Sequence, residues 1–373
     1  MRILQVAPLW ERVPPPAYGG TEAVVSLLTD GLVRRGHDVV LRASGDSITL
    51  AELRSVYPRS LRTAEEVGST LSYDLVHAAD ALYDAGDFDV VHNHMGEMLM
   101  AFADLLDVPM LTTTHGNLTP DSRFVWERYN GFFNTISWSQ AKHIVGFRNA
   151  RFAGVVHNAI DVASYPFRAD KDDHLLCLAR VSPEKGTHLS IEVARRLEMP
   201  LIIAGKVDKV DHDYFRTAIE PEIDGKQIRF FGEADARQKR ELYSRARVLL
   251  APISWEEPFG LVMPEAMACG TPVVAFARGA APEIIEDGET GFLVHNVDEM
   301  VEAVRRVGEI DPARCRSHVE KRFDIPVMVD GYLGAYERML ETVQAERPLP
   351  VSVLQSESLA GAKRDLPAGS RAS

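Results

Sequence analysis

Short apolar runs of four to six residues alternate with amphipathic stretches along most of this 373-residue chain. That alternation is typical of βα units, which build a parallel sheet. It occurs twice, so the sequence predicts two α/β units. The strands predicted in the first unit span 3–7, 39–41, 89–92 and 110–114, with 133–136 and 155–156 as further elements of that unit. Those predicted in the second unit span 175–179, 201–204, 228–231, 272–276 and 292–294.

Helical periodicity fills the intervals between these strands. The first predicted helix carries its apolar residues on one face and ends at Gly36. Residues 44–88 are mostly helical in composition. The other predicted helices span 188–196, 262–269, 297–307 and 312–323, an apolar stripe over 327–343 indicates a last one, and 141–145 is a further element of the first unit.

The stretch 254–272 is the most informative part of the chain, because it predicts a loop that opens into a short helix. Pro258 interrupts any helix begun upstream, and Pro264 is tolerated only in a first helical turn. Gly270 supplies the helix stop. The helix therefore spans roughly 262–269.

Two carboxylates flank the start of this helix. Glu257 lies in the loop and Glu265 lies just inside the helix, so they bracket backbone N–H groups that lack a partner in the first turn. Those N–H groups and the helix dipole favour an anion. The two acids would repel a bare phosphate and are better suited to neutral hydroxyls, such as those of a sugar and a ribose. A nucleotide sugar has all three parts.

Two other turns are suited to phosphate groups. Arg180 and Lys185 lie five residues apart between the strand 175–179 and the next helix. Arginine offers a bidentate fork and lysine a point charge, so this pair can clamp a diphosphate. Gly19 and Gly20 come just ahead of the first helix, where glycine lets backbone amides approach a phosphate closely.

Three histidines follow strands of the first unit, where open α/β sheets place ligands. His92 and His94 have no third ligand at metal-binding spacing, so we interpret them as loop histidines that make polar contacts. His115 is placed to face the cleft. The D-x-D sequence at 211–213 imitates a metal motif but stands alone in a polar, helical segment. We interpret it as accidental, and no metal site is predicted.

Composition narrows the class of protein. The chain is 46% hydrophobic and 25% charged, which is ordinary for a globular protein and allows two cores. It contains no run of 18 apolar residues and begins directly with a strand, so we expect no integral membrane segment and a cytoplasmic protein. The three cysteines lie far apart and imply neither a disulfide framework nor a zinc site.

Charge excludes further classes. A formal net charge of −13 argues against nucleic acid as a partner, because nucleic-acid phosphates require an excess of lysine and arginine. Acids also outnumber bases in residues 1–160, so a polybasic membrane anchor is not predicted. No predicted strand is followed by G-x-G-x-x-G, which argues against a dinucleotide dehydrogenase.

The loop and helix around Glu257 and Glu265 resemble a known motif. With Pro258-Phe259-Gly260 inside and Gly270-Thr271-Pro272 behind, the segment is similar to the Glu-x7-Glu motif of retaining, nucleotide-sugar-dependent glycosyltransferases of the GT-B architecture, and most similar to glycosyltransferase family four. The basic turn, which reads Pro183-Glu184-Lys185-Gly186, matches too. Two other segments resemble that family with one change each. They are 157–161, with Ala159 where glycine is usual, and 279–283, with Ala280 in place of the second glycine.

The resemblance implies a role for each of these groups. Glu257 would hold the hydroxyls of the donor sugar and Glu265 the ribose. The basic pair would neutralise the leaving diphosphate, the glycine pair would reach it, and the third histidine would lie at the edge of the donor-sugar pocket. The implied catalytic residues are Glu257, His115, Arg180 and Lys185. The implied donor-binding residues are Gly19, Gly20, Arg180, Lys185, Glu257, Phe259, Gly260, Leu261, Val262 and Glu265.

The resemblance also implies the architecture. Over roughly 1–345 we expect an α/β protein with two doubly wound, Rossmann-like parallel-sheet domains that face a cleft. The acceptor-side domain is expected over 1–165 and the domain that binds the donor over 166–325. The helix 326–345 is expected to cross back to the first domain. Residues 347–373 are rich in proline, serine, alanine and glycine and are predicted to be a disordered tail.

The implied activity is transfer of a sugar from a nucleoside-diphosphate sugar to an acceptor hydroxyl, with retention of anomeric configuration and without a metal ion. No cofactor is expected beyond the donor substrate. The acceptor can be a carbohydrate, a lipid-linked molecule or a small molecule, and the nucleotide and sugar also stay open. Two alternatives are a GT-B-like nucleotide-sugar epimerase and a non-catalytic nucleotide-sugar-binding protein. The two acids and the basic pair together favour transfer.

Overall fold

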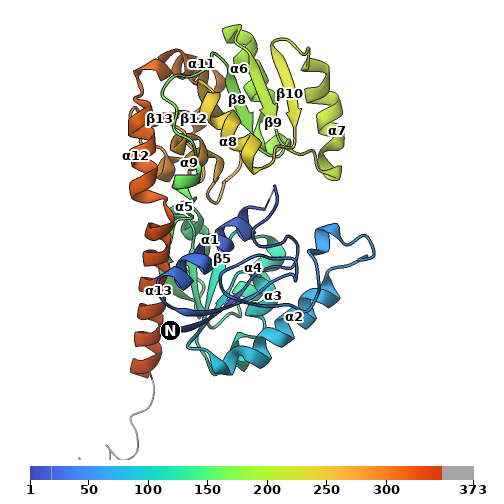
Figure 1. The fold of residues 1–373 in the computed structure, drawn as a ribbon, viewed down its shortest axis with the longest axis vertical. Helices are drawn as coiled ribbons and strands as arrows, with labels where there is room; N and C mark the ends of the chain where they lie inside the picture. Colours follow the sequence, from blue (N-terminus) through green and yellow to red (C-terminus); the bar gives the residue numbers. More distant parts are fainter. Residues whose placement is uncertain (18, 347–373) are drawn as a thin grey trace, which may run out of the picture.

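The computed structural model describes residues 1–17 and 19–346, so the tail predicted over 347–373 lies outside the described residues. Two parallel sheets form two lobes, one above the other in Figure 1. We refer to the lobe with strands β1 to β7 as the first domain and to the lobe with strands β8 to β13 as the second domain. This is the predicted pair of Rossmann-like units facing a cleft.

The first domain has seven strands in the order β3-β2-β1-β4-β5-β6-β7, all parallel. Strand order reverses between β1 and β4, and doubly wound sheets open a ligand crevice at the carboxyl ends of the strands beside such a reversal. The strands are β1 Arg2–Val6, β2 Asp38–Arg42, β3 Glu52–Arg54, β4 Val90–Asn93, β5 Met110–Thr114, β6 Phe132–Thr135 and β7 Arg151–Val155.

The second domain has six parallel strands in the order β10-β9-β8-β11-β12-β13, with the reversal between β8 and β11. Both domains therefore point the carboxyl ends of their central strands toward the cleft. The strands are β8 Leu175–Leu178, β9 Leu201–Ala204, β10 Ile228–Gly232, β11 Val248–Ala251, β12 Val273–Phe276 and β13 Gly291–Val294.

Helices cover both faces of each sheet, as the predicted βα pattern requires. In the first domain they are α1 Gly20–Arg34, α2 Leu71–Asp84, α3 Glu97–Met100, α4 Pro120–Trp126 and α5 Trp138–Ile144. After β8 they are α6 Thr187–Leu197, α7 His212–Tyr214, α8 Ala236–Arg245, α9 Val262–Ala268, α10 Ala281–Ile284, α11 Val297–Arg306, α12 Pro312–Arg322 and α13 Ile325–Glu346.

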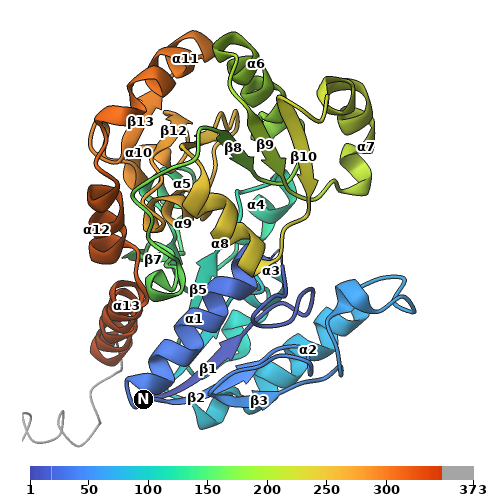
Figure 2. The same cartoon turned by 45° about the horizontal axis from the view of Figure 1, so that its top comes forward.

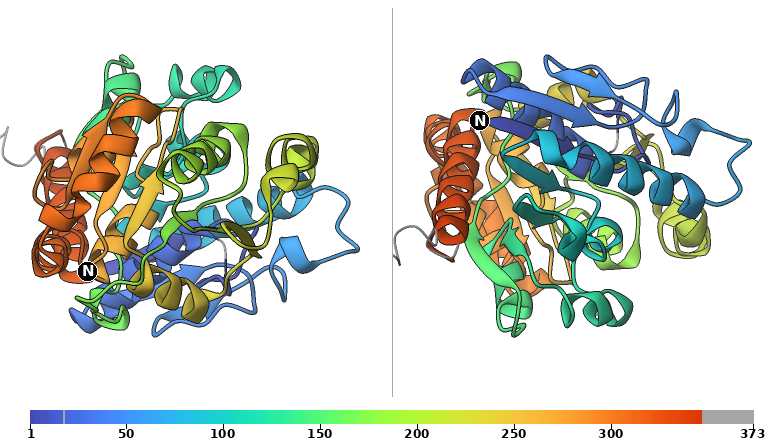
Figure 3. Two further views of the ribbon diagram at one scale, coloured as in Figure 1. Left: turned by 90° about the horizontal axis from the view of Figure 1, so that it is seen from above. Right: turned by 90° about the horizontal axis from the view of Figure 1, so that it is seen from below.

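The last helix, α13, returns to the first domain, as predicted. Its buried Tyr332 and Tyr336 belong to the same apolar cluster as Ile3 of β1. Gly31 of α1 lies close against this helix, because a methyl group at Gly31 would stand 2.5 Å from Cγ2 of Val329. Figure 1 shows α13 running along the first domain, and the view from below in Figure 3 places it beside the N-terminus.

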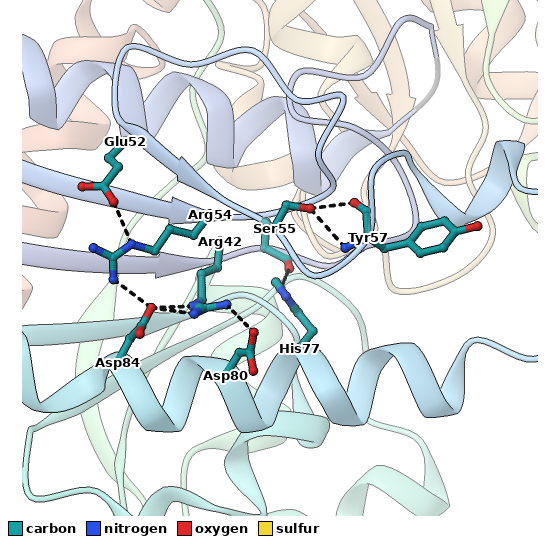
Figure 4. A network of polar contacts seen from close by, with 9 residues as sticks. Arg42, Glu52, Arg54, Ser55, Tyr57, His77, Asp80 and Asp84 are labelled. Carbon is teal, nitrogen blue, oxygen red and sulfur yellow. Dashed lines mark hydrogen bonds and ion pairs between the residues drawn. The ribbon is translucent and has the colours of Figure 1, made fainter.

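A polar network fastens α2 to the edge of the first sheet (Figure 4). Arg42 at the end of β2 and Arg54 of β3 both bind Asp84 of α2, at 2.5 and 2.9 Å. On the same helix, Nε2 of His77 donates to the carbonyl oxygen of Ala7, just beyond β1, at 3.0 Å. Burial lowers the pKa of His77 to about 4, so the ring is neutral near pH 7. The network holds α2 against the ends of β1, β2 and β3.

Two expectations about elements were wrong. The stretch 44–88 was expected to be mostly helical, yet it contains the edge strand β3, whose Glu-Leu-Arg sequence is extended because it pairs with β2. Strand β11 was not predicted at all, although it lies at the centre of the second sheet. No glycine or proline separates it from α8, so periodicity alone merges the strand with the helix.

Candidate active site

Two adjoining cavities lie between the domains, at the carboxyl ends of the strands. The larger has a volume of about 550 Å³ and the smaller about 360 Å³. Both are lined by Gly19 and Gly20 at the start of α1, by Leu261 and Val262 at the start of α9, and by Arg180. Figure 2 shows α8 and α9 of the second domain lying over α1 of the first. The glycine pair and the start of α9 thus face each other across the cleft.

Glu257 lies in the loop before α9 and is paired with Lys185. Its Oε2 lies 2.5 Å from Nζ of Lys185 and accepts a hydrogen bond from Nε1 of Trp255 at 2.6 Å. Gly279 allows this loop to pack closely, because a Cβ there would lie 2.4 Å from the backbone nitrogen of Glu257. Both members of the ion pair line the larger cavity. The acid predicted to hold the sugar and a base predicted to neutralise the diphosphate are therefore in direct contact.

Glu265 lies in the first turn of α9 and is buried beside the smaller cavity. It accepts hydrogen bonds from the phenols of Tyr165, at 2.9 Å, and Tyr243, at 2.7 Å. Glu257 lines the larger cavity and Glu265 the smaller one, although they are only eight residues apart in the sequence. This separation is what the predicted division between sugar and ribose requires.

Arg180 stands between the two cavities and is held by carboxylates. Its Nη1 lies 3.0 Å from Oδ2 of Asp211 and 3.8 Å from Oδ2 of Asp208, and its Nη2 binds Glu184. Its partner in the predicted clamp, Lys185, is paired with an acid as well. A diphosphate that bound here would therefore take the place of these carboxylates around the two cations.

The position of Asp211 corrects one interpretation of the sequence. We took the D-x-D at 211–213 to be accidental and to stand alone, but Asp211 is buried against Arg180. It comes 31 residues after that arginine, so no local pattern indicates the contact. Among residues 1–17 and 19–346 there is no group of three or more His, Cys, Asp or Glu side chains that could hold a metal ion. The contact thus makes Asp211 a partner of the predicted clamp.

The glycine loop has the backbone shape that the sequence suggests. Gly19 precedes α1 with φ of 152°, and a Cβ there would lie 2.7 Å from Cβ of Pro15. At Gly20 a Cβ would lie 3.7 Å from Leu261 across the cleft. The absence of side chains leaves the first turn of α1 accessible from both cavities. Glu22 is the acid of that turn.

His115 faces the larger cavity at the end of a chain of hydrogen bonds. Its Nε2 lies 2.9 Å from Nδ1 of His94, and Nε2 of His94 lies 2.8 Å from the side-chain oxygen of Gln5. The amide nitrogen of Gln5 donates to the phenol of Tyr336 on α13 at 3.0 Å. That oxygen lies 2.6 Å from Nδ1 of His92. This series of hydrogen bonds connects the last helix to the cleft.

The hydrogen-bond donors and acceptors in this series of side chains are mutually consistent. The oxygen of Gln5 can only accept, so His94 carries its proton on Nε2 and offers a lone pair on Nδ1. His115 therefore donates from Nε2 and keeps an unprotonated Nδ1. Desolvation lowers the pKa of His115 to about 4 and holds the pKa values of His92 and His94 well below their usual range. All three rings are neutral near pH 7.

His92 and His94 correct a second interpretation. We took both as loop histidines, but His92 belongs to β4 and both side chains are buried. The expected polar contacts exist, since Nε2 of His92 lies 2.6 Å from Oγ1 of Thr113. A buried polar group needs such partners because burial removes its water. These partners come from β1, β5 and α13, so the sequence next to the histidines does not indicate them.

Glu283 connects the two domains beside the cleft. The carboxylate of Glu283, at the start of α10, accepts hydrogen bonds from the backbone N–H groups of Trp138 and Ser139, at 2.7 and 2.6 Å. It also lies 3.0 Å from Nε2 of His157. These bonds lower the pKa of Glu283, although burial opposes them. An acid from the second domain thus binds the start of α5 in the first.

Sequence reasoning assigned no role to several residues that line one of the two cavities or contact a predicted site residue. They are Trp10, Glu11, Glu22, Asn158, Tyr165, Lys206, Asp208, Tyr243 and Trp255. Some signals were available, because Trp10 and Glu11 closely follow β1 at its carboxyl end and Glu22 follows the glycine pair. The tyrosines carried no signal, since only the fold brings them to Glu265.

Comparison with known families accounts for most of the chain. Residues 165–321 match the model described as "Glycosyl transferases group 1", and residues 18–163 match the model described as "Glycosyltransferase Family 4". A glycogen synthase of Mycobacterium tuberculosis is 30% identical, over 84% of this chain and 87% of the relative. A D-inositol 3-phosphate glycosyltransferase of Mycolicibacterium smegmatis is 27% identical, over 74% of this chain and 73% of the relative.

Solved structures share the fold. A sucrose-phosphate synthase from Thermosynechococcus elongatus superposes with a TM-score of 0.74 at 18% identity, over 91% of this chain and 99% of the other. A glycosyltransferase involved in avilamycin A biosynthesis superposes with a TM-score of 0.69 at 24% identity, over 91% of this chain and 98% of the other. At these identities the likeness concerns the arrangement of the two domains.

Proposed function

The chain belongs to the nucleotide-sugar-dependent glycosyltransferases of group 1 and family 4, which have the GT-B architecture. From that premise we propose that it transfers a sugar from a nucleoside-diphosphate sugar to an acceptor hydroxyl with retention of configuration and without a metal ion. This assigns donor binding mainly to residues 166–325 and acceptor binding to residues 1–165. The epimerase and the non-catalytic binding protein are the alternatives that this proposal replaces.

One observation carries the proposal. The two adjoining cavities contain one motif acid each, and they meet at Arg180 and the glycine pair. A nucleoside-diphosphate sugar has the same order of parts. Its sugar would lie beside Glu257 and His115, its diphosphate beside Arg180 and Lys185, and its ribose beside Glu265. The segment from Phe259 to Val262, which leads into α9, would direct backbone N–H groups toward the diphosphate.

The charges support a role for the basic pair in departure of the nucleotide. Negative charge develops on the diphosphate as its bond to the sugar breaks, and preorganised cations stabilise that charge in a site with little water. Within residues 1–17 and 19–346, Glu257 is the one ion-pair partner of Lys185, so a bound diphosphate can share the lysine while the acid turns to the sugar hydroxyls. Arg180 can exchange Asp211 and Glu184 for phosphate oxygens in the same way.

Retention follows from attack on the face that the leaving group vacates. The acceptor oxygen forms a bond to the anomeric carbon, and the bond from that carbon to the diphosphate oxygen breaks with its electron pair. The acceptor proton passes to that diphosphate oxygen. Arg180 and Lys185 supply the positive charge that a metal ion supplies in other transferases, and no cofactor is needed.

The setting of the reaction is part of the proposal. No helix within the described residues is long and apolar enough to cross a bilayer. The three cysteines are buried and free, which suits the reducing cytoplasm, and a net charge of −13 disfavours nucleic acid. By their names, the relatives described above are a glycogen synthase and a glycosyltransferase of D-inositol 3-phosphate, so we expect a carbohydrate, lipid-linked or small-molecule acceptor.

The experiment that tests this function is a screen of UDP-, GDP- and ADP-sugars by thermal shift, followed by transfer assays with the donor that binds. A ligand that binds only the folded state raises the melting temperature by mass action. The anomeric proton of the product, read by NMR, gives the stereochemistry. Activity should persist in EDTA. If no nucleotide sugar bound, the proposed donor class would be wrong. A product of inverted anomeric configuration would contradict retention. Loss of activity in EDTA with rescue by Mn²⁺ would contradict metal independence.

A further inference from the structure

The first-domain wall of the larger cavity carries two side chains that the donor does not use. They are Trp10, in the loop after β1, and Glu22, in the first turn of α1. Both line the same cavity as Glu257 and His115. The donor scheme above assigns sugar, diphosphate and ribose to other residues. These two side chains are therefore available to a second substrate.

Trp10 is an aromatic surface on a fixed backbone. Its side chain is 51% exposed although it is large and apolar. The loop beneath it is held by Arg62, whose backbone N–H donates to the carbonyl oxygen of Trp10 at 3.0 Å, and by Leu9, which is fully buried. Because this exposed indole lines the cavity, a ligand that entered the cavity could cover it and remove its apolar surface from water. The flat apolar face of an indole fits the C–H face of a sugar ring.

Glu22 is a carboxyl that is buried without a cation. The residue is only 5% exposed. Within residues 1–17 and 19–346, no lysine or arginine forms an ion pair with its carboxyl group. Burial raises the pKa of Glu22 to about 7, against the backbone N–H groups that lower it. A buried carboxyl of this kind can accept a hydrogen bond from a neutral hydroxyl, which asks for no charge compensation.

The rest of this wall is acidic as well. Glu11 is buried and forms an ion pair with Arg62, so that arginine is already engaged. Among the described residues, the cationic side chains that line the cavity are Arg180 and Lys185, and both come from the second domain where the donor diphosphate would bind. A phosphate on the acceptor would lie beside Glu22 and the Glu11–Arg62 pair, and the described residues that line this wall of the cavity offer it no cation.

We propose that Trp10 and Glu22 form the acceptor subsite, and that the acceptor is an uncharged sugar or cyclitol ring rather than a phosphorylated one. The ring lies on the indole of Trp10, and one hydroxyl donates a hydrogen bond to Glu22. The attacking hydroxyl then faces the donor sugar held by Glu257. This inference rests on the proposed function, because it names the second substrate of the same cleft.

The first experiment measures transfer with acceptors that differ only in a phosphate. UDP-glucose and ADP-glucose are offered with three pairs, namely glucose and glucose 6-phosphate, myo-inositol and its 3-phosphate, and maltose and its 1-phosphate. We expect the neutral member of the accepted pair to have the larger kcat/KM by about tenfold or more, which corresponds to one unpaired charge near the site. A phosphorylated acceptor used as well as its neutral partner would overturn the inference and leave the proposed transferase function intact.

The second experiment separates acceptor binding from donor binding. Glu22→Gln and Trp10→Ala should raise KM for the acceptor by roughly tenfold, the size of one or two lost contacts. The Kd of UDP, measured by calorimetry, should stay within about twofold. Trp138→Ala is the matched control, because Trp138 is also half exposed, at 58%, but lies outside the cavity. Unchanged acceptor KM in both cleft variants would refute the subsite.

A third measurement does not depend on turnover. With UDP bound, neutral sugars are titrated while tryptophan fluorescence is recorded for the wild type and for Trp10→Phe. A sugar-dependent change that is present in the wild type and lost in Trp10→Phe supports the subsite. An identical change in both proteins, or no change at any sugar, overturns it. Failure of every nucleotide to bind would instead contradict the proposed function itself.

Discussion

The two walls of the cleft are built in different ways. On the second-domain wall the functional side chains are charged and already paired, as in Lys185 with Glu257 and Arg180 with Asp211. On the first-domain wall His115 ends a chain of neutral hydrogen bonds that runs through His94 into the core. If a diphosphate binds as we propose, the side chains of the second-domain wall must exchange partners. The first-domain wall keeps its partners and supplies a fixed shape.

That difference predicts which perturbations affect which wall. Exchange of ion-pair partners depends on charge, so substitutions that neutralise the second-domain wall should act on donor binding and turnover. A neutral buried network depends on the protonation state of its rings, so the first domain should respond to acid and to small changes in hydrogen bonding. The four predictions below test this contrast, from the largest expected effect to the smallest.

The largest effect should come from the clamp. Arg180→Ala and Lys185→Ala should each lower kcat/KM by about a hundredfold or more, because each removes a cation from the place where negative charge develops. Arg196→Ala is the matched control, since Arg196 is an ion-paired arginine on the exposed face of α6. Circular dichroism checks the fold. Equal affinity of wild type and both clamp variants for a nucleoside diphosphate would show that the clamp is wrong.

Acid should destabilise the first domain through His77. Its pKa is about 4 in the folded protein against about 6.5 unfolded, so the unfolded chain takes up the proton first as pH falls. Stability from the neutral ring is present above pH 6.5 and is lost between 6.5 and 4, by up to about 3 kcal/mol. Denaturant titration at several pH values measures this loss. His77→Gln should lose less over that window, and an equal loss would assign the acid sensitivity to other groups.

The two acids of the motif should fail differently. Glu257→Gln should leave the affinity for free nucleoside diphosphate nearly intact while it impairs turnover, because a charged hydrogen bond to the sugar contributes about 1.5–3 kcal/mol and the diphosphate lacks that sugar. Glu265→Gln should weaken diphosphate and donor alike. Calorimetry with the diphosphate decides between them. If both substitutions weaken it equally, the division of roles between the two cavities does not hold.

The smallest effect should come from the last helix. Tyr336→Phe removes the hydroxyl that accepts from Gln5, whereas the hydroxyl of Tyr332 bonds to Thr113, at 3.3 Å, and to Asn134, and lies off the path to His115. Each change should cost about 0.5–1.5 kcal/mol of stability. Only Tyr336→Phe should also lower kcat and shift the acidic side of the dependence of kcat on pH. The reason is that Gln5 and His94 would no longer be held in one orientation. If kcat depended on pH in the same way in both variants, the series of hydrogen bonds from Tyr336 to His115 would have only a structural role.

Some parts of the candidate site could be predicted from the sequence without knowledge of the fold. The helix start at Val262, the turn that holds Arg180 and Lys185, and the glycine pair before α1 are all local, since each is encoded by proline, glycine and periodicity within about ten residues. The apolar stripe of α13 was equally readable. Residues that act through a distant partner were not, and Asp211, Tyr165 and Tyr243 are examples.

The sequence by itself determined the two Rossmann-like units, the returning helix and the family, because strand and helix periods, turn residues and motif spacing are local properties of a chain. Only the tertiary structure decided which charges meet and which histidines are buried. Gln5 and Tyr336 lie 331 residues apart, and Tyr165 reaches Glu265 across 100 residues. Such contacts depend on how packed elements bring their side chains together, and no local pattern in a sequence records that.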